Sequence, residues 1–142
     1  NNVKLFKAMA KNLKCEIVES SENGNEATVK AHITTLDFAK IMSNISSRLM
    51  VEYMTPGNSG KDMDKVFSGI IDDEIKYADK KESDTVFNFV KNEKGNWTLD
   101  SNVAIYDDIC GGYLQYYFQQ NTLGKYANEI KEKQQSETTT QS

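Results

Sequence analysis

The stretch from Thr85 to Ser101 predicts two β-strands joined by a tight turn, and it constrains the fold of this chain more than any other segment. Both flanks of the turn are rich in β-branched and aromatic residues, and Gly95 supplies the positive φ that a short hairpin loop of this type needs. The hairpin also holds Trp97, the only tryptophan of the chain. Because a two-stranded hairpin is marginal in water, we expect further strands or a covering helix around it.

A second hairpin is predicted near the N-terminus. The strand-like runs 15–19 and 27–34 flank an Asn23-Gly24 pair, which is a strong signal for a hairpin turn. In the second run, apolar residues alternate with polar ones, which indicates an antiparallel sheet with one buried and one wetter face. The apolar positions of that run are Ala27, Val29, Ala31 and Ile33.

Apolar residues at helical spacing predict helices over 3–13, 38–54 and 63–78, with Asp37 as the N-cap of the second. A further long helix is expected from about Val103, in which Gly111-Gly112 allows another element to approach closely. The order α-β-β-α-α-β-β-α predicts an α+β fold, with a curved antiparallel sheet of about four strands in two hairpins, packed by helices. Helices on one face would bury a defined set of residues: Val29, Ile33, Phe87, Phe89, Trp97 and Leu99.

The length of 142 residues suits one domain, which we place at 1–133, followed by a polar tail at 134–142 without apolar residues. Within the domain, 121–124 is an expected interruption before a helical segment at 125–133. No apolar run approaches the roughly 18 residues that a membrane span requires. The net charge of −4 arises from mixed signs, which does not favour nucleic acid as a partner.

The sequence offers little for catalysis. His32 is the only histidine, and the strand alternation places it on the wetter face with no nucleophile near it in sequence. The acidic clusters 72–74 and 107–108 consist of consecutive helical residues, whose side chains point in different directions and cannot converge on one metal ion. Cys15 and Cys110 form no CxxC motif, and their pairing stays open. We expect no catalytic residue, no metal and no cofactor.

Aromatic residues are the most suggestive feature of the C-terminal half. A tyrosine can bury its ring while its hydroxyl group meets a partner, which suits core packing, a protein interface or the wall of a ligand pocket. These alternatives stay open at this point. The candidate residues for a pocket or an interface are Phe87, Phe89, Trp97, Tyr113, Tyr116 and Tyr117.

Three signals within residues 5–118 carry a resemblance to a known group of proteins. They are a Gly-containing turn before Ala27-Thr28-Val29, the return Gly95-Asn96-Trp97, and Gly111-Gly112, set in the segments ENGNEATVKAHITTLDFAKIM and DTVFNFVKNEKGNWTLDSNVAIYDDICGGYL. The chain thereby resembles uncharacterised secreted lipoprotein domains of Gram-positive bacteria, which are similar to the nuclear-transport-factor-2-like, or cystatin-like, superfamily. Members of that group usually carry more helices before the first hairpin than the one expected here.

The resemblance implies a cone-like sheet with helices in its concave side, located outside the cell on a lipid anchor. The anchoring cysteine would lie outside this sequence, since Cys15 has no lipobox before it. We therefore expect a non-catalytic extracellular binding or interaction domain, whose partner is an unknown small apolar ligand, a protein or a second copy in a homodimer. The alternative is a small cone-fold enzyme of the isomerase or dehydratase type that uses an aspartate and His32 inside the cavity.

Overall fold

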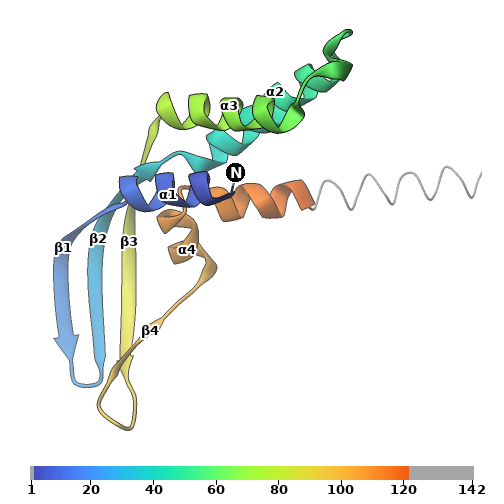
Figure 1. Cartoon of the computed structure of the whole chain (residues 1–142). Helices are drawn as coiled ribbons and strands as arrows, with labels where there is room; N and C mark the ends of the chain where they lie inside the picture. Colours follow the sequence, from blue (N-terminus) through green and yellow to red (C-terminus); the bar gives the residue numbers. More distant parts are fainter. Residues whose placement is uncertain (1, 122–142) are drawn as a thin grey trace, which may run out of the picture.

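The computed structural model describes residues 2–121 and shows an α+β fold with a four-stranded antiparallel sheet (Figure 1). The predicted fold class is confirmed. The elements are α1 (Asn2–Asn12), β1 (Lys14–Asn23), β2 (Glu26–Leu36), α2 (Phe38–Met54), a short 3-10 helix η1 (Asn58–Gly60), α3 (Met63–Lys76), β3 (Lys80–Lys91), β4 (Trp97–Asp100) and α4 (Val103–Ile109). Residues 113–121 are also helical. The expected segments at 122–133 and the tail at 134–142, and with them the proposed domain boundary, lie outside the described residues.

The two predicted hairpins join into one sheet, in the order β1-β2-β3-β4. The register pairs Val29 with Phe87, and Phe89 with both Ala27 and Leu99. These side chains therefore share one face of the sheet with Ala31 and Ile33, which we call the inner face. The opposite, outer face carries His32, as the alternation predicted. The two hairpins are thus held together by pairing between strands that lie far apart in sequence.

The helices gather at one end of the sheet, and the other end projects away from them (Figure 1). The core lies at the helical end, where α1, α2 and α3 meet the end of β2; its buried members are Ala8, Leu36, Phe38, Ile41, Ile45, Ile70 and Ile71. At the projecting end, which we call the free half of the sheet (residues 18–23, 26–30, 86–91 and 97–100), most side chains are exposed or half-buried. The hydrophobic stabilisation is therefore concentrated at one end of the molecule.

This arrangement corrects one expectation. Ile33 is buried, but Val29, Phe87 and Phe89 are only half-buried, and both Trp97 and Leu99 are 38% exposed. The apolar alternation correctly identified the residues that share a face. It does not report how far along that face the helices extend, and they stop short of the tips of the hairpins (Figure 1).

The expected long helix after Val103 is instead two helices separated by a turn. Residue Ile109 ends α4, and the helical residues 113–121 follow Gly111 and Gly112, whose φ angles are +61° and +81°. Glycine favours such backbone angles because it has no Cβ atom to clash with the following carbonyl oxygen. The backbone N–H of Ala39 donates to the carbonyl oxygen of Gly111 at 3.2 Å, so the turn packs against the start of α2. The close approach predicted for the glycine pair is confirmed.

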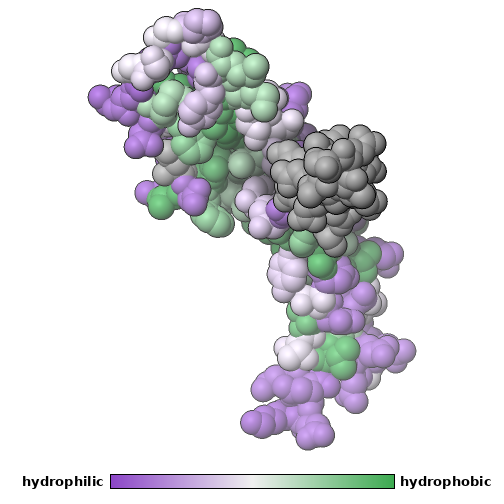
Figure 2. Space-filling model, turned by 90° about the vertical axis from the view of Figure 1, so that its right-hand side faces the viewer, coloured by the Kyte–Doolittle hydropathy of each residue, from purple (hydrophilic) through white to green (hydrophobic). Residues whose placement is uncertain are grey.

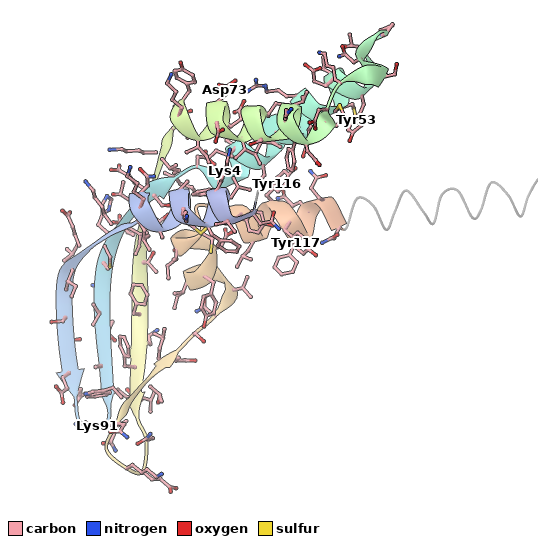
Figure 3. All side chains as sticks on the ribbon, in the orientation of Figure 1. Lys4, Tyr53, Asp73, Lys91, Tyr116 and Tyr117 are labelled. Carbon is pink, nitrogen blue, oxygen red and sulfur yellow. The ribbon has the colours of Figure 1, made fainter. Side chains whose placement is uncertain are left out.

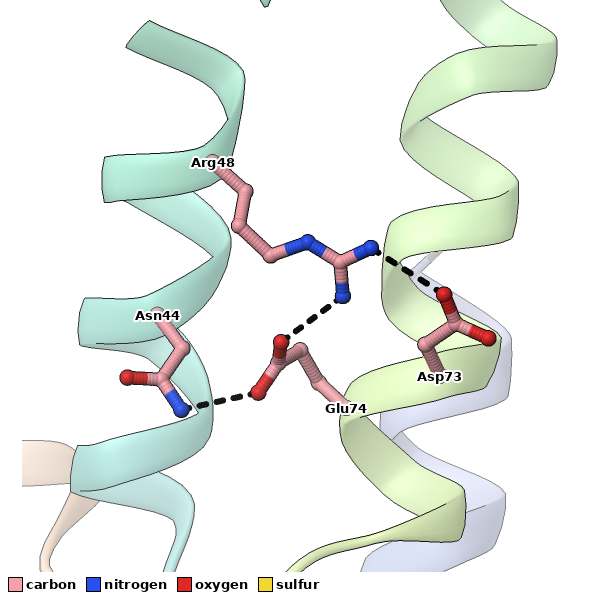
Figure 4. Close-up of polar contacts among 4 residues, drawn as sticks. All are labelled: Asn44, Arg48, Asp73 and Glu74. Atoms are coloured by element: carbon pink, nitrogen blue, oxygen red, sulfur yellow. Dashed lines mark hydrogen bonds and ion pairs between the residues drawn. The ribbon is translucent and has the colours of Figure 1, made fainter. Parts of the chain in front are cut away.

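Polar contacts link the helices to one another. Asp37 caps α2, since its Oδ1 accepts from the backbone N–H of Lys40 at 3.0 Å, as the sequence predicted. Between α2 and α3, Arg48 donates to Glu74 Oε1 at 2.8 Å and to Asp73 Oδ2 at 3.0 Å (Figure 4). Such contacts are partly exposed and contribute more to the orientation of the helices than to stability.

Candidate functional site

An apolar cavity of about 410 Å³ lies where α1, the first turns of α2 and residues 110–114 meet. We call it the helical cavity. Its lining consists of Asn2, Leu5, Phe6, Met9, Phe38, Met42, Cys110, Tyr113 and Leu114. Figure 2 shows hydrophobic residues gathered at the helical end of the molecule, whereas hydrophilic residues cover the tip of the sheet. The volume falls within the range of roughly 300 to 1,000 Å³ that is usual for small-molecule pockets.

The local sequence explains how this cavity forms. In α1, Leu5 and Met9 are four residues apart and so lie on one side of the helix. The same spacing places Phe38 and Met42 together on α2. The turn at residues 110–112 then brings Cys110 and the following helix against these side chains. Three segments that are remote in sequence therefore each supply one wall.

The chemistry of the helical cavity is almost entirely that of hydrocarbon surface. None of its lining residues carries a charge, and only Asn2, Cys110 and Tyr113 bring polar side-chain atoms. Burial raises the pKa of the Cys110 thiol, and the negative charge of Asp107 raises it further. The thiol is therefore held in its neutral, less nucleophilic form. Both cysteines are free, and Cys15 is exposed on β1, so they do not form a disulfide.

A smaller cavity of about 260 Å³ lies on the inner face of the free half of the sheet, lined by Glu22, Ala27, Val29, Phe89 and Trp97. The ammonium group of Lys91 lies 4.6 Å from the centroid of the Trp97 ring and 3.4 Å from Glu22 Oε1. The Trp97 ring that lines this cavity is therefore already in a cation–π contact with a cation of the chain itself.

A third cavity, of about 250 Å³ and lined mainly by polar residues, lies between the start of α2 and the end of α3. Lys40 and Asp79 form an ion pair in its wall. The hydrogen bond to Asp79 raises the pKa of Lys40, and the same contact lowers the pKa of Asp79. Both groups are charged and paired, so this contact holds the chain where α3 returns to the sheet.

The structure does not bring the six candidate aromatic residues together. Phe89 and Trp97 line the sheet cavity, with Phe87 beside them on the inner face, whereas Tyr113 lines the helical cavity. The hydroxyl group of Tyr116 shares a hydrogen bond of 3.1 Å with Ser46 Oγ on α2. Tyr117 is 51% exposed, and its ring centroid lies 6.4 Å from that of Tyr113 (Figure 3). The candidates thus divide between the sheet and the helical end.

The residues of α1 and α2 that line the helical cavity were not among the candidate site residues predicted from the sequence. Leu5, Phe6, Met9, Phe38 and Met42 belong to apolar stripes of the kind that every core-facing helix shows. Spacing along one helix cannot distinguish a side chain that fills the core from one that faces a cavity. The high exposure of Phe6, at 70%, appears only in the folded structure.

His32 lies on the outer face and lines none of these three cavities. Its Nδ1 lies 2.8 Å from Asp84 Oδ1, and its Nε2 lies 3.7 Å from Glu82 Oε1. The hydrogen bond to Asp84 is the main cause that raises the pKa of His32, and the charge of Glu82 acts in the same direction. The imidazole is 34% exposed, and this arrangement is that of a surface ion pair between neighbouring strands.

The acidic clusters are engaged with separate partners. Asp72 pairs with Lys4 of α1 at 2.7 Å, while Asp73 and Glu74 both accept from Arg48 (Figure 4). In the other cluster, Asp107 accepts from the backbone N–H of Gln115 and Asp108 accepts from the hydroxyl group of Thr85. Within residues 2–121, no group of three or more histidine, cysteine or acidic residues is placed to hold a metal ion.

Comparison with known proteins yields one structural likeness. No family model matches the sequence, and no curated protein matches it. The fold is similar to a crystal structure from Bacillus subtilis whose name is "putative lipoprotein (ycdA)", with a TM-score of 0.48 and 18% sequence identity. The match covers 75% of this chain and 34% of that protein, so the chain spans about a third of its length. The similarity to the nuclear-transport-factor-2-like superfamily stays a prediction.

Helix length bears on one further expectation. Over residues 2–121, none of the helices has both the length and the apolar character needed to cross a bilayer. Within that range α2 is the longest helix, with 17 residues, and its sequence includes Lys40, Arg48 and Glu52.

Proposed function

We propose that this chain is a non-catalytic binding domain and that its helical cavity holds an apolar ligand. The observation that carries the proposal is the cavity itself, with a volume of about 410 Å³ and a lining without charged side chains. The cavity is open to solvent beside Phe6, which is 70% exposed. Its size and its apolar lining are typical of a ligand pocket.

The energetics favour occupation by an apolar group. A ligand that entered would remove its own surface and that of the lining from water, which contributes about 25 cal/mol per Å² of apolar area. The lining offers a polar side chain only at Asn2, Cys110 and Tyr113, so a ligand with many hydrogen-bonding groups would lose its contacts with water without replacement. The cavity thus selects against polar ligands.

The position of His32 gives little support to the alternative enzyme. That function requires His32 and an aspartate inside a common cavity. The pair that forms, His32 with Asp84, instead lies on the open outer face, with Asp84 at 89% side-chain exposure. General acid–base chemistry at this pair would take place in contact with bulk water, without a pocket to orient a substrate. A binding function therefore has more support than catalysis.

We further propose that the domain acts at the cell surface on a lipid anchor. This part rests on the sequence resemblance to secreted lipoproteins. Fractionation of the source cells, with detection of the native protein in the membrane fraction and its release by a lipase or by detergent, tests this location. Recovery of the protein only in the cytoplasmic fraction would refute it.

An apolar fluorescent dye tests the binding function. N-phenyl-1-naphthylamine emits strongly only in apolar surroundings, and we expect saturable binding to the full chain. The variant Leu114→Lys places a charge in the lining and should weaken dye binding at least tenfold. The matched control Val90→Lys places the same charge on the outer face of the sheet, at a residue that is 45% exposed, and should bind as the unchanged protein does. Circular dichroism verifies that both variants fold.

Two results would contradict the proposal. One is dye binding that does not saturate, which indicates nonspecific adsorption to exposed apolar surface. The other is equal weakening by Leu114→Lys and Val90→Lys, which would place the dye outside the helical cavity. Native mass spectrometry of protein purified from its own source adds a direct measurement, because a retained ligand appears as a defined mass increment.

A further inference from the structure

We infer that the ligand of the helical cavity is an unbranched aliphatic chain of at most roughly fourteen carbons, the alkyl or acyl part of a lipid whose polar end stays outside. This inference rests on the proposed binding function and specifies the chemical class of the ligand. It is carried by the volume of the cavity, the chemistry of its lining and the apolar surface next to it.

The volume sets the size of the ligand. A methylene group occupies about as much space as a water molecule in the liquid, roughly 30 Å³, so about 410 Å³ accommodates at most roughly fourteen such groups. A shorter chain would leave part of the lining in contact with water or with empty space. Each methylene group that is buried contributes about 0.8 kcal/mol, so affinity should rise with chain length up to this size.

The lining favours a chain over a rigid ring system. Met9 and Met42 face the cavity with unbranched, polarisable side chains that adjust their shape, and Leu5 and Leu114 extend the aliphatic wall. Such side chains can adjust to the shape of a flexible ligand. No charged side chain lines the cavity to hold an ionic group inside, so the part of the ligand that enters carries no charge.

Apolar surface continues outward from the cavity. Phe6 lines it and is 70% exposed, and Tyr117 lies one helical turn beyond Tyr113 and is 51% exposed. Phe6 thus carries exposed apolar surface at the cavity itself, and the Tyr117 ring adjoins the lining residue Tyr113, with 6.4 Å between the ring centroids. An amphiphile can therefore place its hydrocarbon chain in the cavity and against this bordering apolar surface. Its polar end then remains in water.

The two cysteines provide an experiment with an internal control. Cys110 lines the cavity, whereas Cys15 is exposed on β1. The full chain is treated separately with N-ethyl-, N-octyl- and N-dodecylmaleimide, and the alkylation rate at each thiol is measured by peptide mass spectrometry. With the ethyl reagent, Cys110 should react more slowly than Cys15 because it is half-buried. If an alkyl chain binds first, the ratio of the rate at Cys110 to that at Cys15 rises at least tenfold from ethyl to dodecyl.

A compact aromatic reagent separates this inference from the proposed function. If N-(1-pyrenyl)maleimide selects Cys110 and the dodecyl reagent does not, the cavity binds apolar ligands but not aliphatic chains, and only the present inference is overturned. If neither reagent selects Cys110, both the inference and the proposed function are overturned. The gain with the dodecyl reagent should disappear in Leu114→Lys and persist in Val90→Lys, whereas an equal gain in both variants would overturn the inference.

Protection of Cys110 from N-ethylmaleimide tests whether the aliphatic ligand comes from a free fatty acid or from a membrane lipid. Protection by monomeric dodecanoate supports a free fatty acid as ligand, and protection by phosphatidylglycerol vesicles supports a membrane lipid; either result supports an aliphatic chain. Absence of protection by both overturns the inference. Protection that increases with protein concentration alone would assign the cavity to a second copy of this chain, and would also overturn it.

Discussion

Gly111 lies directly against the carbonyl oxygen of Leu36, so closely that a Cβ atom added to Gly111 would collide with that oxygen. Leu36 ends β2, and Gly111 belongs to the turn between α4 and residues 113–121. This contact fixes the turn at the junction of β2 and α2. It therefore determines where Cys110 and Tyr113 lie relative to Phe38 across the helical cavity.

The substitution Gly111→Ala should strongly destabilise the fold. Alanine at a φ of +61° costs about 1–2 kcal/mol, and the collision with Leu36 adds to this cost, for a total of about 3 kcal/mol or more. Urea unfolding followed by circular dichroism measures the loss. The control Gly95→Ala has a similar φ of +80° but open space around it, so it should cost only about 1–2 kcal/mol. Equal losses of unfolding free energy in the two variants would show that the backbone around Gly111 shifts and relieves the collision.

Truncation of two large side chains should have unequal effects. Phe38 is 1% exposed in the core, and Phe38→Ala should cost about 3–5 kcal/mol in the free energy of unfolding. Trp97 is larger but 38% exposed on the free half of the sheet, so Trp97→Ala should cost less than about 2 kcal/mol. Chemical denaturation of both variants tests the difference. If Trp97→Ala is the more damaging, the free half is covered in solution.

His32 should make the stability of the sheet depend on pH. Its pKa in the folded state is raised above the ordinary value of 6.5, chiefly by the hydrogen bond to Asp84. Protonation therefore favours the folded state, and this contribution is fully present below pH 6.5 and disappears as the pH rises through the folded pKa. Because His32 is the only histidine, its imidazole signal in an NMR titration is unambiguous. The variant Asp84→Asn should lower its pKa, and an unchanged pKa would contradict the assigned cause.

The ion pairs between α2 and α3 should contribute little to stability. Arg48 contacts both Asp73 and Glu74, but its side chain is 42% exposed (Figure 4). We expect Arg48→Gln to cost at most about 1 kcal/mol in the free energy of unfolding. The difference from the unchanged protein should shrink in 1 M sodium chloride, where the Debye length is about 3 Å. If Arg48→Gln instead lowers the free energy of unfolding strongly and independently of salt, the Glu74 carboxylate behaves as a buried charge that Arg48 compensates.

Local sequence patterns determined the elements of this fold. Period-two alternation placed Ala31 and Ile33 on the buried face of β2 and His32 on the opposite face. The N-cap at Asp37 followed from the preference of carboxylate side chains for free N–H groups at a helix start. The positive φ of Gly95 followed from the demands of a short hairpin. Each of these properties depends on residues close together in the chain.

Tertiary structure alone decided how far the helices cover the sheet and where a cavity remains. Trp97 and Phe38 both belong to apolar patterns, yet one is 38% exposed and the other 1%. An apolar pattern reports which side chains share a face of one element, but burial depends on the length and position of whatever element packs against that face. The helical cavity likewise needs walls from α1, α2 and residues 110–114, and the contact between Gly111 and Leu36 sets where the last of these meets α2.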